Sequence, residues 1–288
     1  MSGTIIENFS YLLPDECIAR FPATPRHNSK LLVYQNGGIT DDRYVNLAAH
    51  LPAQALLLLN NSKVIEARLH FKKSTGGQVE VFCLEHSDIY PDVSSAMQQK
   101  GSVEWWCQIG GVKKWKTGPI ELSFETNGSQ HILNAEQMQR SGAGFKILFT
   151  WTATDLTFAE ILHIAGKIPL PPYLNREADE NDKSSYQTVY AKEDGSVAAP
   201  TAGLHLTETV FEQLAVKDIQ TATLTLHVGA GTFKPVKTET AEAHDMHAEF
   251  IEVRQELLEA LLQKPEQTRI AVGTTSLRTL ESIYWMGV

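Results

Sequence analysis

Residues 268–285 read TRIAVGTTSLRTLESIYW, an apolar run followed by a glycine-threonine loop and a periodic helical segment. This order predicts a strand, a turn and a helix. Upstream, IQTATLTLHVGAGTF (219–233) alternates apolar and polar residues and ends in glycines, which predicts a half-buried strand. The runs 31–34 and 56–59 predict short buried strands. Strands alternating with helices indicate an α/β core whose site lies at the strand ends.

Residues 66–150 have a different sequence pattern, with many short segments of alternating apolar and polar residues and clear turn signals. Glycines 76 and 77 predict one hairpin, and the pair Asn127 and Gly128 favours a type I′ turn in a second. Residues 86–102 are expected to form a polar loop. We predict a small antiparallel β-barrel domain at 66–150, inserted into an α/β domain made of residues 1–65 and 151–288.

Composition excludes several classes of protein. The chain has 288 residues and a net charge of −9, the wrong sign for indiscriminate nucleic-acid binding, so any RNA contact needs a local basic patch. The longest apolar run, residues 55–59, is far too short to span a membrane. The N-terminus lacks signal-peptide features and the three cysteines are scattered, so we expect a cytoplasmic protein.

Two stretches of small residues precede predicted helices. In SVAAPTAGLHLTETVFEQL (196–214), Thr207 is expected to cap the helix and His205 to point into an open surface beside free N–H groups. In VGTTSLR (272–278) the hydroxyl residues have two readings, helix caps or a ligand site, and Arg278 favours the ligand. We expect one cavity lined by Ala199, Pro200, Thr201, Gly203, His205 and residues 273–278.

Other motifs leave alternatives open. HDMHAE (244–249) supplies possible metal ligands, but it is not a helical zinc pattern, so solvated histidines or a hydrogen-bonding site are favoured over a metal site. His227 lies on the polar face of its strand, next to the glycines of GAGTFK, which lacks the third glycine of a dinucleotide fingerprint. Arg68, at the start of the insert, suits either a structural ion pair or a cleft between domains.

Lysines surround a tryptophan in the inserted domain. Lys113, Lys114 and Lys116 flank Trp115, a mixture of basic and aromatic residues that suits RNA binding. The alternative is that tryptophans fill the barrel while the lysines solvate a turn, and this alternative is somewhat favoured.

Taken in order, these motifs resemble those of one family, the S-adenosylmethionine:tRNA ribosyltransferase-isomerases of queuosine biosynthesis. The matching segments are FPATPRHNSKLL, LNNSKVIEARL, GGQVEV, GKIPLPPYLNR, YQTVYA, GSVAAPTAGLHLT, LHVGAGTFKPV, HDMHAE and VGTTSLRTLES. The resemblance implies a barrel-like α/β domain interrupted by a small β-barrel, with the active site between them.

The resemblance also implies a reaction. The ribosyl part of S-adenosylmethionine is transferred to 7-aminomethyl-7-deazaguanine at the wobble position of a tRNA and is isomerised, giving epoxyqueuosine-tRNA, adenine and methionine. S-adenosylmethionine is thus a consumed substrate, and neither a cofactor nor a metal is expected. The partners are S-adenosylmethionine and the tRNA carrying this base, and family members are monomers.

Residue roles follow from the matching motifs. A proton must leave the carbon beside the sulfonium and another must reach adenine, and histidine suits both tasks near neutral pH. We predict His205, His227 and Arg278 as catalytic residues, without deciding which histidine is the acid. The predicted substrate-binding residues are Asn60, Arg68, Tyr190, Pro200, Thr201, Gly203, Gly229, Gly231, His247, Glu249, Thr274, Thr275 and Ser276.

This chain departs from the family pattern in places. Asn61, Ser62 and Lys63 replace Asp-Thr-Arg, and Leu206 replaces Phe; both changes keep the general chemistry. The family continues beyond IYWMGV, so we expect a C-terminally truncated chain with an incomplete site wall, weak turnover and self-association through an exposed strand edge. A metal-dependent hydrolase using HDMHAE and a non-catalytic tRNA-binding remnant are the rival functions.

Overall fold

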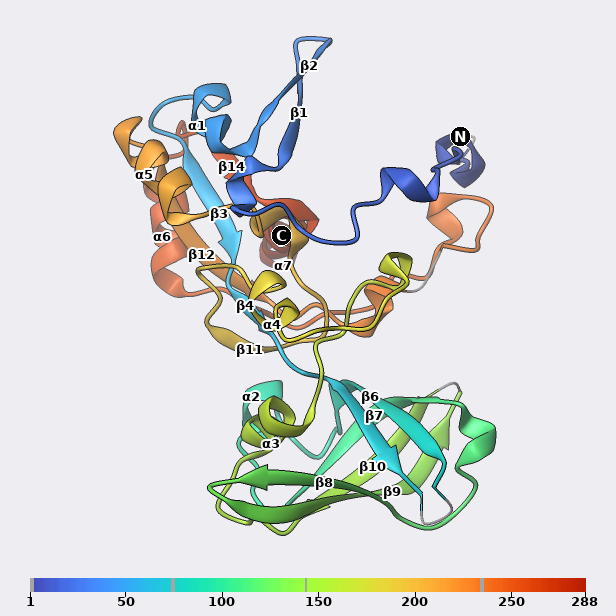
Figure 1. Cartoon of the computed structure of the whole chain (residues 1–288). Coiled ribbons are helices and arrows are strands. Elements are labelled where there is room, and N and C mark those ends of the chain that lie inside the picture. Colours follow the sequence, from blue (N-terminus) through green and yellow to red (C-terminus); the bar gives the residue numbers. More distant parts are fainter. Residues whose placement is uncertain (1–2, 74–75, 143, 234–235) are drawn as a thin grey trace.

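The computed structural model describes residues 3–73, 76–142, 144–233 and 236–288. Figure 1 shows a barrel of strands joined to a sheet flanked by helices. Lys234 and Pro235 of the LHVGAGTFKPV segment lie outside the described residues. None of the helices in the described part combines the length and the apolar character needed to cross a lipid bilayer.

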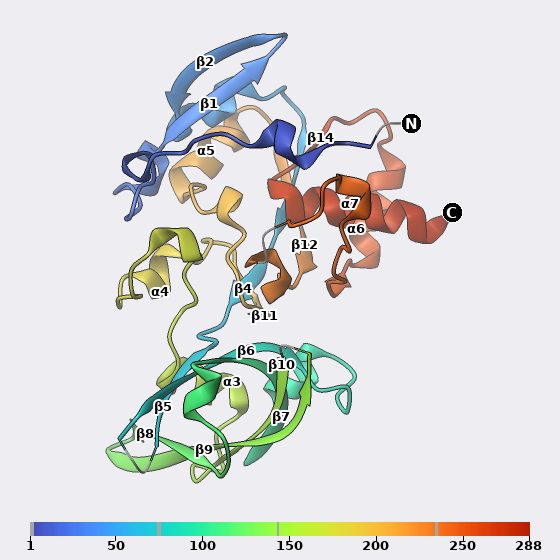
Figure 2. The ribbon, with the colours of Figure 1, turned by 90° about the vertical axis from the view of Figure 1, so that its right-hand side faces the viewer.

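Six strands close into an antiparallel barrel in the order β10-β7-β6-β5-β8-β9, and Figure 2 shows them curving into a ring. Asn127 and Gly128 both have positive φ, 51° and 72°, as a type I′ turn requires. The predicted α/β fold with a small antiparallel β-barrel is confirmed. The strands are β5 (Arg68–Lys72), β6 (Gln78–His86), β7 (Ser102–Gly110), β8 (Ile120–Thr126), β9 (Ser129–Ser141) and β10 (Gly144–Trp151).

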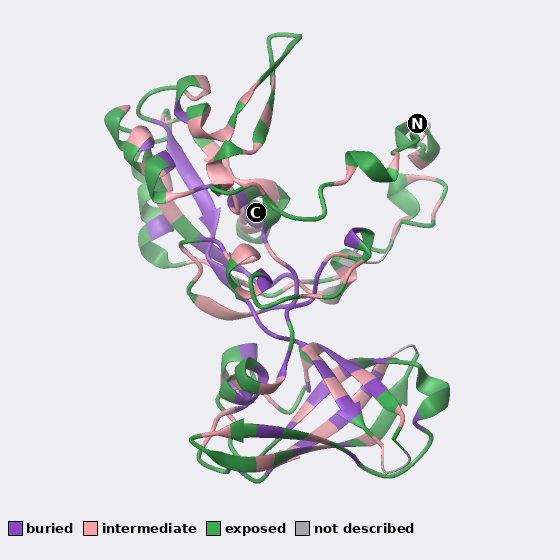
Figure 3. Cartoon of the chain, viewed as in Figure 1, coloured by how far each residue is buried: buried purple, intermediate pink, exposed green. Residues whose placement is uncertain are grey.

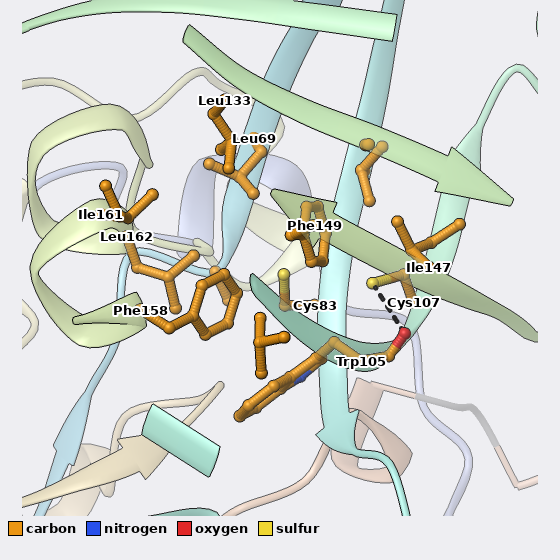
Figure 4. Close-up of a cluster of buried hydrophobic side chains, with 14 of the residues drawn as sticks. Leu69, Cys83, Trp105, Cys107, Leu133, Ile147, Phe149, Phe158, Ile161 and Leu162 are labelled. Atoms are coloured by element: carbon orange, nitrogen blue, oxygen red, sulfur yellow. Dashed lines mark hydrogen bonds between the residues drawn. The ribbon is translucent and has the colours of Figure 1, made fainter. Parts of the chain in front are cut away.

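Alternating residues fill the barrel. In β10 the buried positions are every second residue, which places Ile147 and Phe149 inside (Figure 4). Helix α3 (Phe158–Ala165) adds Phe158, whose ring lies 5.4 Å from that of Phe149. A capping box between Thr157 and Glu160 starts this helix.

The expected polar loop over 86–102 contains a helical turn, so this prediction is wrong in its middle. Helix α2 (Val93–Met97) is capped by Asp92, whose carboxylate accepts the N–H of Ser95 at 2.7 Å. Val93, Ala96 and Met97 are buried against the barrel. A short apolar face, masked by polar neighbours, was sufficient to fold this segment onto the core.

The second part is built on the sheet β13-β12-β3-β14. Strands β12 (Gln220–Leu226) and β14 (Arg269–Ala271) run parallel to β3 (Leu56–Asn60), and β13 (Ile251–Glu252) runs antiparallel to β12. Strand β3 is buried along its whole length, as the purple strand in Figure 3 shows. An uninterrupted apolar strand of this kind needs cover on both faces.

Helices supply that cover. Leu57 and Leu59 pack with α1 (Leu47–His50) and α5 (Glu208–Val216). Leu56 and Leu58 pack on the other side, in a cluster with residues of α6 (Gln255–Gln263) and α7 (Gly273–Gly287). Strands β12 and β14 both run parallel to β3, and α7 follows β14 in the chain. The N-terminal end of α7 and the C-terminal end of β12 therefore lie at the same edge of the sheet, where the site forms.

The prediction of a buried strand over 31–34 is wrong. Strands β1 (Lys30–Gln35) and β2 (Gly38–Arg43) pair only with each other in the described structure and project from the sheet (Figure 1). Leu32 and Tyr34 are 68% and 73% exposed. The apolar composition predicted the strand correctly, but whether another element covers a strand is not encoded within it.

Short elements complete the chain. The strands β4 (Ser62–Val64) and β11 (Glu193–Ser196) pair in parallel as a separate two-stranded sheet. The hydroxyls of Ser62 and Ser196 lie 2.8 Å apart. The remaining elements are α4 (Asp182–Ser185), η1 (Ile6–Phe9), η2 (Asp15–Cys17), η3 (Arg26–Asn28), η4 (Tyr44–Asn46), η5 (Val112–Lys114), η6 (Pro172–Leu174), η7 (Thr201–Gly203), η8 (Ala230–Phe233) and η9 (Ala241–Ala243).

Candidate active site

A hollow of about 700 Å³ opens beside the start of α7. This volume lies within the range of roughly 300–1,000 Å³ that small-molecule sites occupy. It combines both small-residue stretches with the glycine loop after β12 and the HDMHAE segment. Its lining residues are Ala199, Pro200, Thr201, Ala202, Val228, Gly231, Thr232, Val236, His244, Met246, His247, Glu249, Gly273, Thr274, Thr275 and Arg278.

The turn from β14 into α7 forms one wall. Gly273 has a φ of +85°, and a Cβ at this position would lie 3.1 Å from the Ala202 side chain. Glycine therefore allows the turn to approach η7 closely. No side chain in the described structure caps α7 through a hydrogen bond. Thr274 and Thr275 are thus not used as caps, and the first N–H groups of the helix remain available to a ligand.

Glu249 joins three segments at the hollow. Its side chain is only 6% exposed. The carboxylate accepts the N–H of Gly229 at 3.1 Å and a guanidinium N–H of Arg278, and Arg278 also donates to the carbonyl of His247 at 2.6 Å. Because a charged partner compensates its burial, this carboxylate can stay inside and hold the glycine loop against α7.

His247 lies over the glycine loop. A Cβ on Gly231 would come within 2.5 Å of Cγ of His247, so only glycine leaves room for the ring. Nε2 of His247 lies 3.3 Å from Oε1 of Glu249, without the alignment of a hydrogen bond. The predicted residues His247, Glu249, Gly231 and Arg278 are therefore brought together.

His205 does not line this hollow, contrary to expectation. Its ring packs against Tyr44 of η4, with centroids 5.0 Å apart and planes inclined by 46°. Partial burial lowers the pKa of His205. Thr207 does not cap α5 either, because its hydroxyl lies 2.9 Å from Nδ1 of His27. Thr201 of η7 lines the hollow, whereas His205, two residues beyond η7, packs against Tyr44.

His227 also lies outside the hollow. Val228 lines the hollow, whereas His227, also just beyond the end of β12, does not. Its ring stacks 6.0 Å from that of Phe250 and abuts Gly195, where a Cβ would lie 2.7 Å from Nδ1. Burial lowers the pKa of His227, and the nearby carboxylates of Glu193 and Asp194 partly oppose this. Catalytic roles for His205 and His227 stay predictions.

Four predicted substrate-binding residues belong to the packing around the site. Asn60 is 1% exposed and bonds through its side chain to the backbone of Leu226 and to the N–H of Ser62. Gly203 is buried against the hydroxyl of Tyr190, whose pKa is raised by burial. Ser276 is fully buried. Neither these four nor the predicted Gly229 line the hollow in the described structure.

Arg68 lies in a separate hollow of about 400 Å³ between the barrel and residues 167–178. Its guanidinium donates to Glu80 at 2.8 Å and lies 4.7 Å from the centre of the Phe82 ring. Both readings of Arg68 thus apply, because it forms an ion pair and also faces an opening. The pKa of Glu80 is lowered by His70 and Arg68.

Trp115 cannot stack on a nucleobase, which corrects one RNA-binding prediction. The side chain is 1% exposed, and its indole N–H donates to the carbonyl of Gly118 at 2.7 Å. Lys113, Lys114 and Lys116 are exposed around it. The tryptophan therefore anchors the turn that displays the lysines.

The donor groups of HDMHAE do not converge on a metal position. Within the described residues, no group of three or more His, Cys, Asp or Glu side chains is arranged to hold an ion. The carboxylate of Glu249 is already engaged by Arg278 and Gly229. A metal-dependent hydrolase is not favoured.

Several lining residues were not predicted. Ala202, Val228, Thr232, Val236, His244 and Met246 complete the hollow. One signal was present in the sequence, since the acid of HDMHAE and the arginine of VGTTSLR can pair. The spacing alone did not reveal that this pair would draw the two motifs to one place.

The fold and the site define an α/β protein with an inserted β-barrel and a ligand-sized hollow at a helix N-terminus. The chain belongs to the queuosine biosynthesis protein family, whose model matches residues 6–286. It is 38% identical, over 97% of its length and 73% of the relative's, to the S-adenosylmethionine:tRNA ribosyltransferase-isomerase of Magnetococcus marinus. It also matches the crystal structure of S-adenosylmethionine tRNA ribosyltransferase from Thermotoga maritima, with a TM-score of 0.40 and 26% identity, over 96% of this chain and 72% of that one.

Proposed function

We propose that this chain is an S-adenosylmethionine:tRNA ribosyltransferase-isomerase. It transfers the ribosyl part of S-adenosylmethionine to 7-aminomethyl-7-deazaguanine in a tRNA, isomerises it to the epoxycyclopentanediol, and releases adenine and methionine. One observation carries this proposal, the 38% identity over 97% of the chain to a relative of that name. The rival non-catalytic remnant predicts tRNA binding without S-adenosylmethionine binding.

The hollow beside α7 is the site we assign to S-adenosylmethionine. Its volume suits a ligand of that size. The uncapped N-terminus of α7 suits the carboxylate of the methionine part, since helix N-termini attract anions. Thr274 and Thr275 offer hydroxyls to the same end of the ligand.

The proton transfers are assigned to the histidines that line the hollow, His244 and His247. His247 is the histidine we favour, because its ring is confined against Gly231 and its Nε2 lies 3.3 Å from a carboxylate oxygen of Glu249. Arg278 keeps Glu249 in place and acts as a positioning residue.

Adenine release tests the function directly. The protein is incubated with S-adenosylmethionine and a tRNA carrying 7-aminomethyl-7-deazaguanine, and adenine and methionine are quantified by chromatography. We expect equal amounts of both with this tRNA, and neither with the same tRNA carrying guanine. His247→Asn should lower the rate about 10²- to 10⁴-fold, the usual contribution of a general acid or base.

Two results would overturn the assignment. Tight tRNA binding with neither S-adenosylmethionine binding nor adenine release would support the non-catalytic remnant. Unchanged activity in His247→Asn, together with loss in His205→Asn, would return the proton chemistry to His205.

A further inference from the structure

A third hollow, of about 390 Å³, lies at the rim of the barrel and is lined mostly by lysines. Four of its six lining residues carry ammonium groups, in a chain whose net charge is −9. None of the four forms an ion pair with a carboxylate of the described residues. The complete lining is Lys73, Gly77, Lys113, Lys114, Lys116 and Thr117.

Internal bonds hold this lysine hollow in shape. The buried Trp115 fixes the turn through Gly118, and the side-chain amide of Gln137 donates to the carbonyl of Trp115 at 3.0 Å. From the neighbouring hairpin, Nζ of Lys73 donates to the carbonyl of Lys114 at 2.5 Å. The lysines are therefore displayed by a folded turn, which reduces the entropy lost when they bind a ligand.

The lining chemistry favours a phosphodiester backbone over an acidic peptide. A stable peptide interface needs apolar or aromatic anchors at its centre, and this hollow has only glycine, threonine and lysine stems. Phosphate groups need only cations at suitable spacing. Because Trp115 is buried, stacking on bases is not available from it, so contact with the backbone is what this turn can supply.

We propose that the lysine hollow binds phosphate groups of the substrate tRNA, outside the catalytic hollow. The identification of the RNA as a tRNA substrate rests on the proposed function. In Figure 1 the turn η5 and the orange segment around η9 lie on the same side of the molecule, so one RNA can contact both parts. The barrel then supplies affinity for tRNA and leaves the chemistry to the α/β part.

Charge reversal tests this proposal. Lys113, Lys114 and Lys116 are changed together to glutamate, and the matched control changes the same three to arginine. Binding of a tRNA transcript is measured by fluorescence anisotropy at several salt concentrations. Each phosphate contact contributes about 0.7–0.9 to the slope of log Kd against log salt, so three lost contacts lower the slope by about 2–3.

The arginine variant is expected to keep the slope of the unmodified protein, because the charge is retained. In steady-state assays the glutamate variant should raise KM for tRNA at least tenfold and leave kcat and the affinity for S-adenosylmethionine unchanged. An unchanged slope in the glutamate variant overturns the proposal.

Lysine acetylation provides a test without substitutions. A water-soluble acetylating reagent is applied with and without the tRNA transcript, and each lysine is read by mass spectrometry. Lys73, Lys113, Lys114 and Lys116 should be protected by RNA, whereas the exposed Lys264 of the α/β part serves as the reference. Equal modification of the four with and without RNA contradicts the proposal.

The two proposals fail differently. If the protein releases adenine but the glutamate variant keeps its salt slope, the lysine hollow is wrong and the function stands. If no adenine is released but tRNA binding depends on these lysines, the function is wrong and the lysine hollow stands.

Discussion

The barrel and the sheet differ in how far along the chain their partners lie. Barrel strands β5 to β10 follow one another in sequence, and most of them pair as neighbouring hairpins. In the sheet, Leu56 of β3 pairs with Gln220 on one side and with Arg269 on the other. The barrel is thus a local structure, whereas the sheet and the hollow beside α7 exist only once distant segments have met. Damage to the barrel should reduce stability or tRNA affinity, and damage at the hollow should reduce catalysis.

The largest expected effect follows the removal of one aromatic ring from the core of the barrel. Phe149 is fully buried between Phe71 and Phe158, with ring centroids 6.3 and 5.4 Å away. Phe149→Ala should lower the free energy of unfolding by about 3–5 kcal/mol, as for other buried aromatic truncations. Denaturant unfolding measures this, and Phe9→Ala, at a side chain 69% exposed, is the control with an expected change below about 0.5 kcal/mol. Equal effects of the two would show that the barrel is not the packed unit described.

The next effect should fall on catalysis alone. Gly231→Ala places a methyl group against His247, so the ring must move away from Glu249. We expect kcat/KM to fall about 10²-fold, the effect of a displacement of roughly 1 Å in a catalytic group, with little change in melting temperature. Gly229→Ala is the matched control, because a Cβ there meets nothing within 4 Å. If both variants are equally active, His247 has no positional role.

Asn60 separates a structural role from a ligand role. Its side chain bonds to the N–H and C=O of Leu226 and to the N–H of Ser62 inside the core. Asn60→Ala should cost about 1–3 kcal/mol of stability, because buried backbone groups lose partners, while S-adenosylmethionine affinity in the folded protein is unchanged. Asn8→Ala, at an exposed position, is the comparison. A stable variant with weakened S-adenosylmethionine binding would restore the predicted substrate-binding role.

Regular patterns made the fold predictable, and long-range placement limited the prediction of the site. The apolar run of β3 and the pair Asn127 and Gly128 act within a few residues, so their structures followed from sequence. The orientation of His227 depends on which neighbours fill the space beside it, Phe250 and Gly195, and no local period encodes them. The small-residue stretches were correctly placed together because both precede helices at one sheet edge.

The smallest expected effect concerns pH. Burial lowers the pKa of His227 in the folded protein below its ordinary value of 6.5. As the pH falls, His227 therefore takes up a proton in the unfolded chain at a higher pH than in the folded protein. The stability that neutral His227 contributes is present above pH 6.5 and decreases below it. The loss is at most about 1.4 kcal/mol per pH unit for one group. Glu193 and Asp194, which favour the charged ring, reduce the size of the effect.

His227→Asn should flatten the fall in unfolding free energy between pH 7.5 and pH 5.5, measured by denaturant titration at each pH. His205 is also buried enough for its pKa to be lowered, so part of the acid sensitivity should persist in His227→Asn. If the pH profile of His227→Asn is identical to that of the unmodified protein, His227 takes up its proton without leaving its contact with Phe250. The inference that His227 is packed in its neutral form would then be wrong.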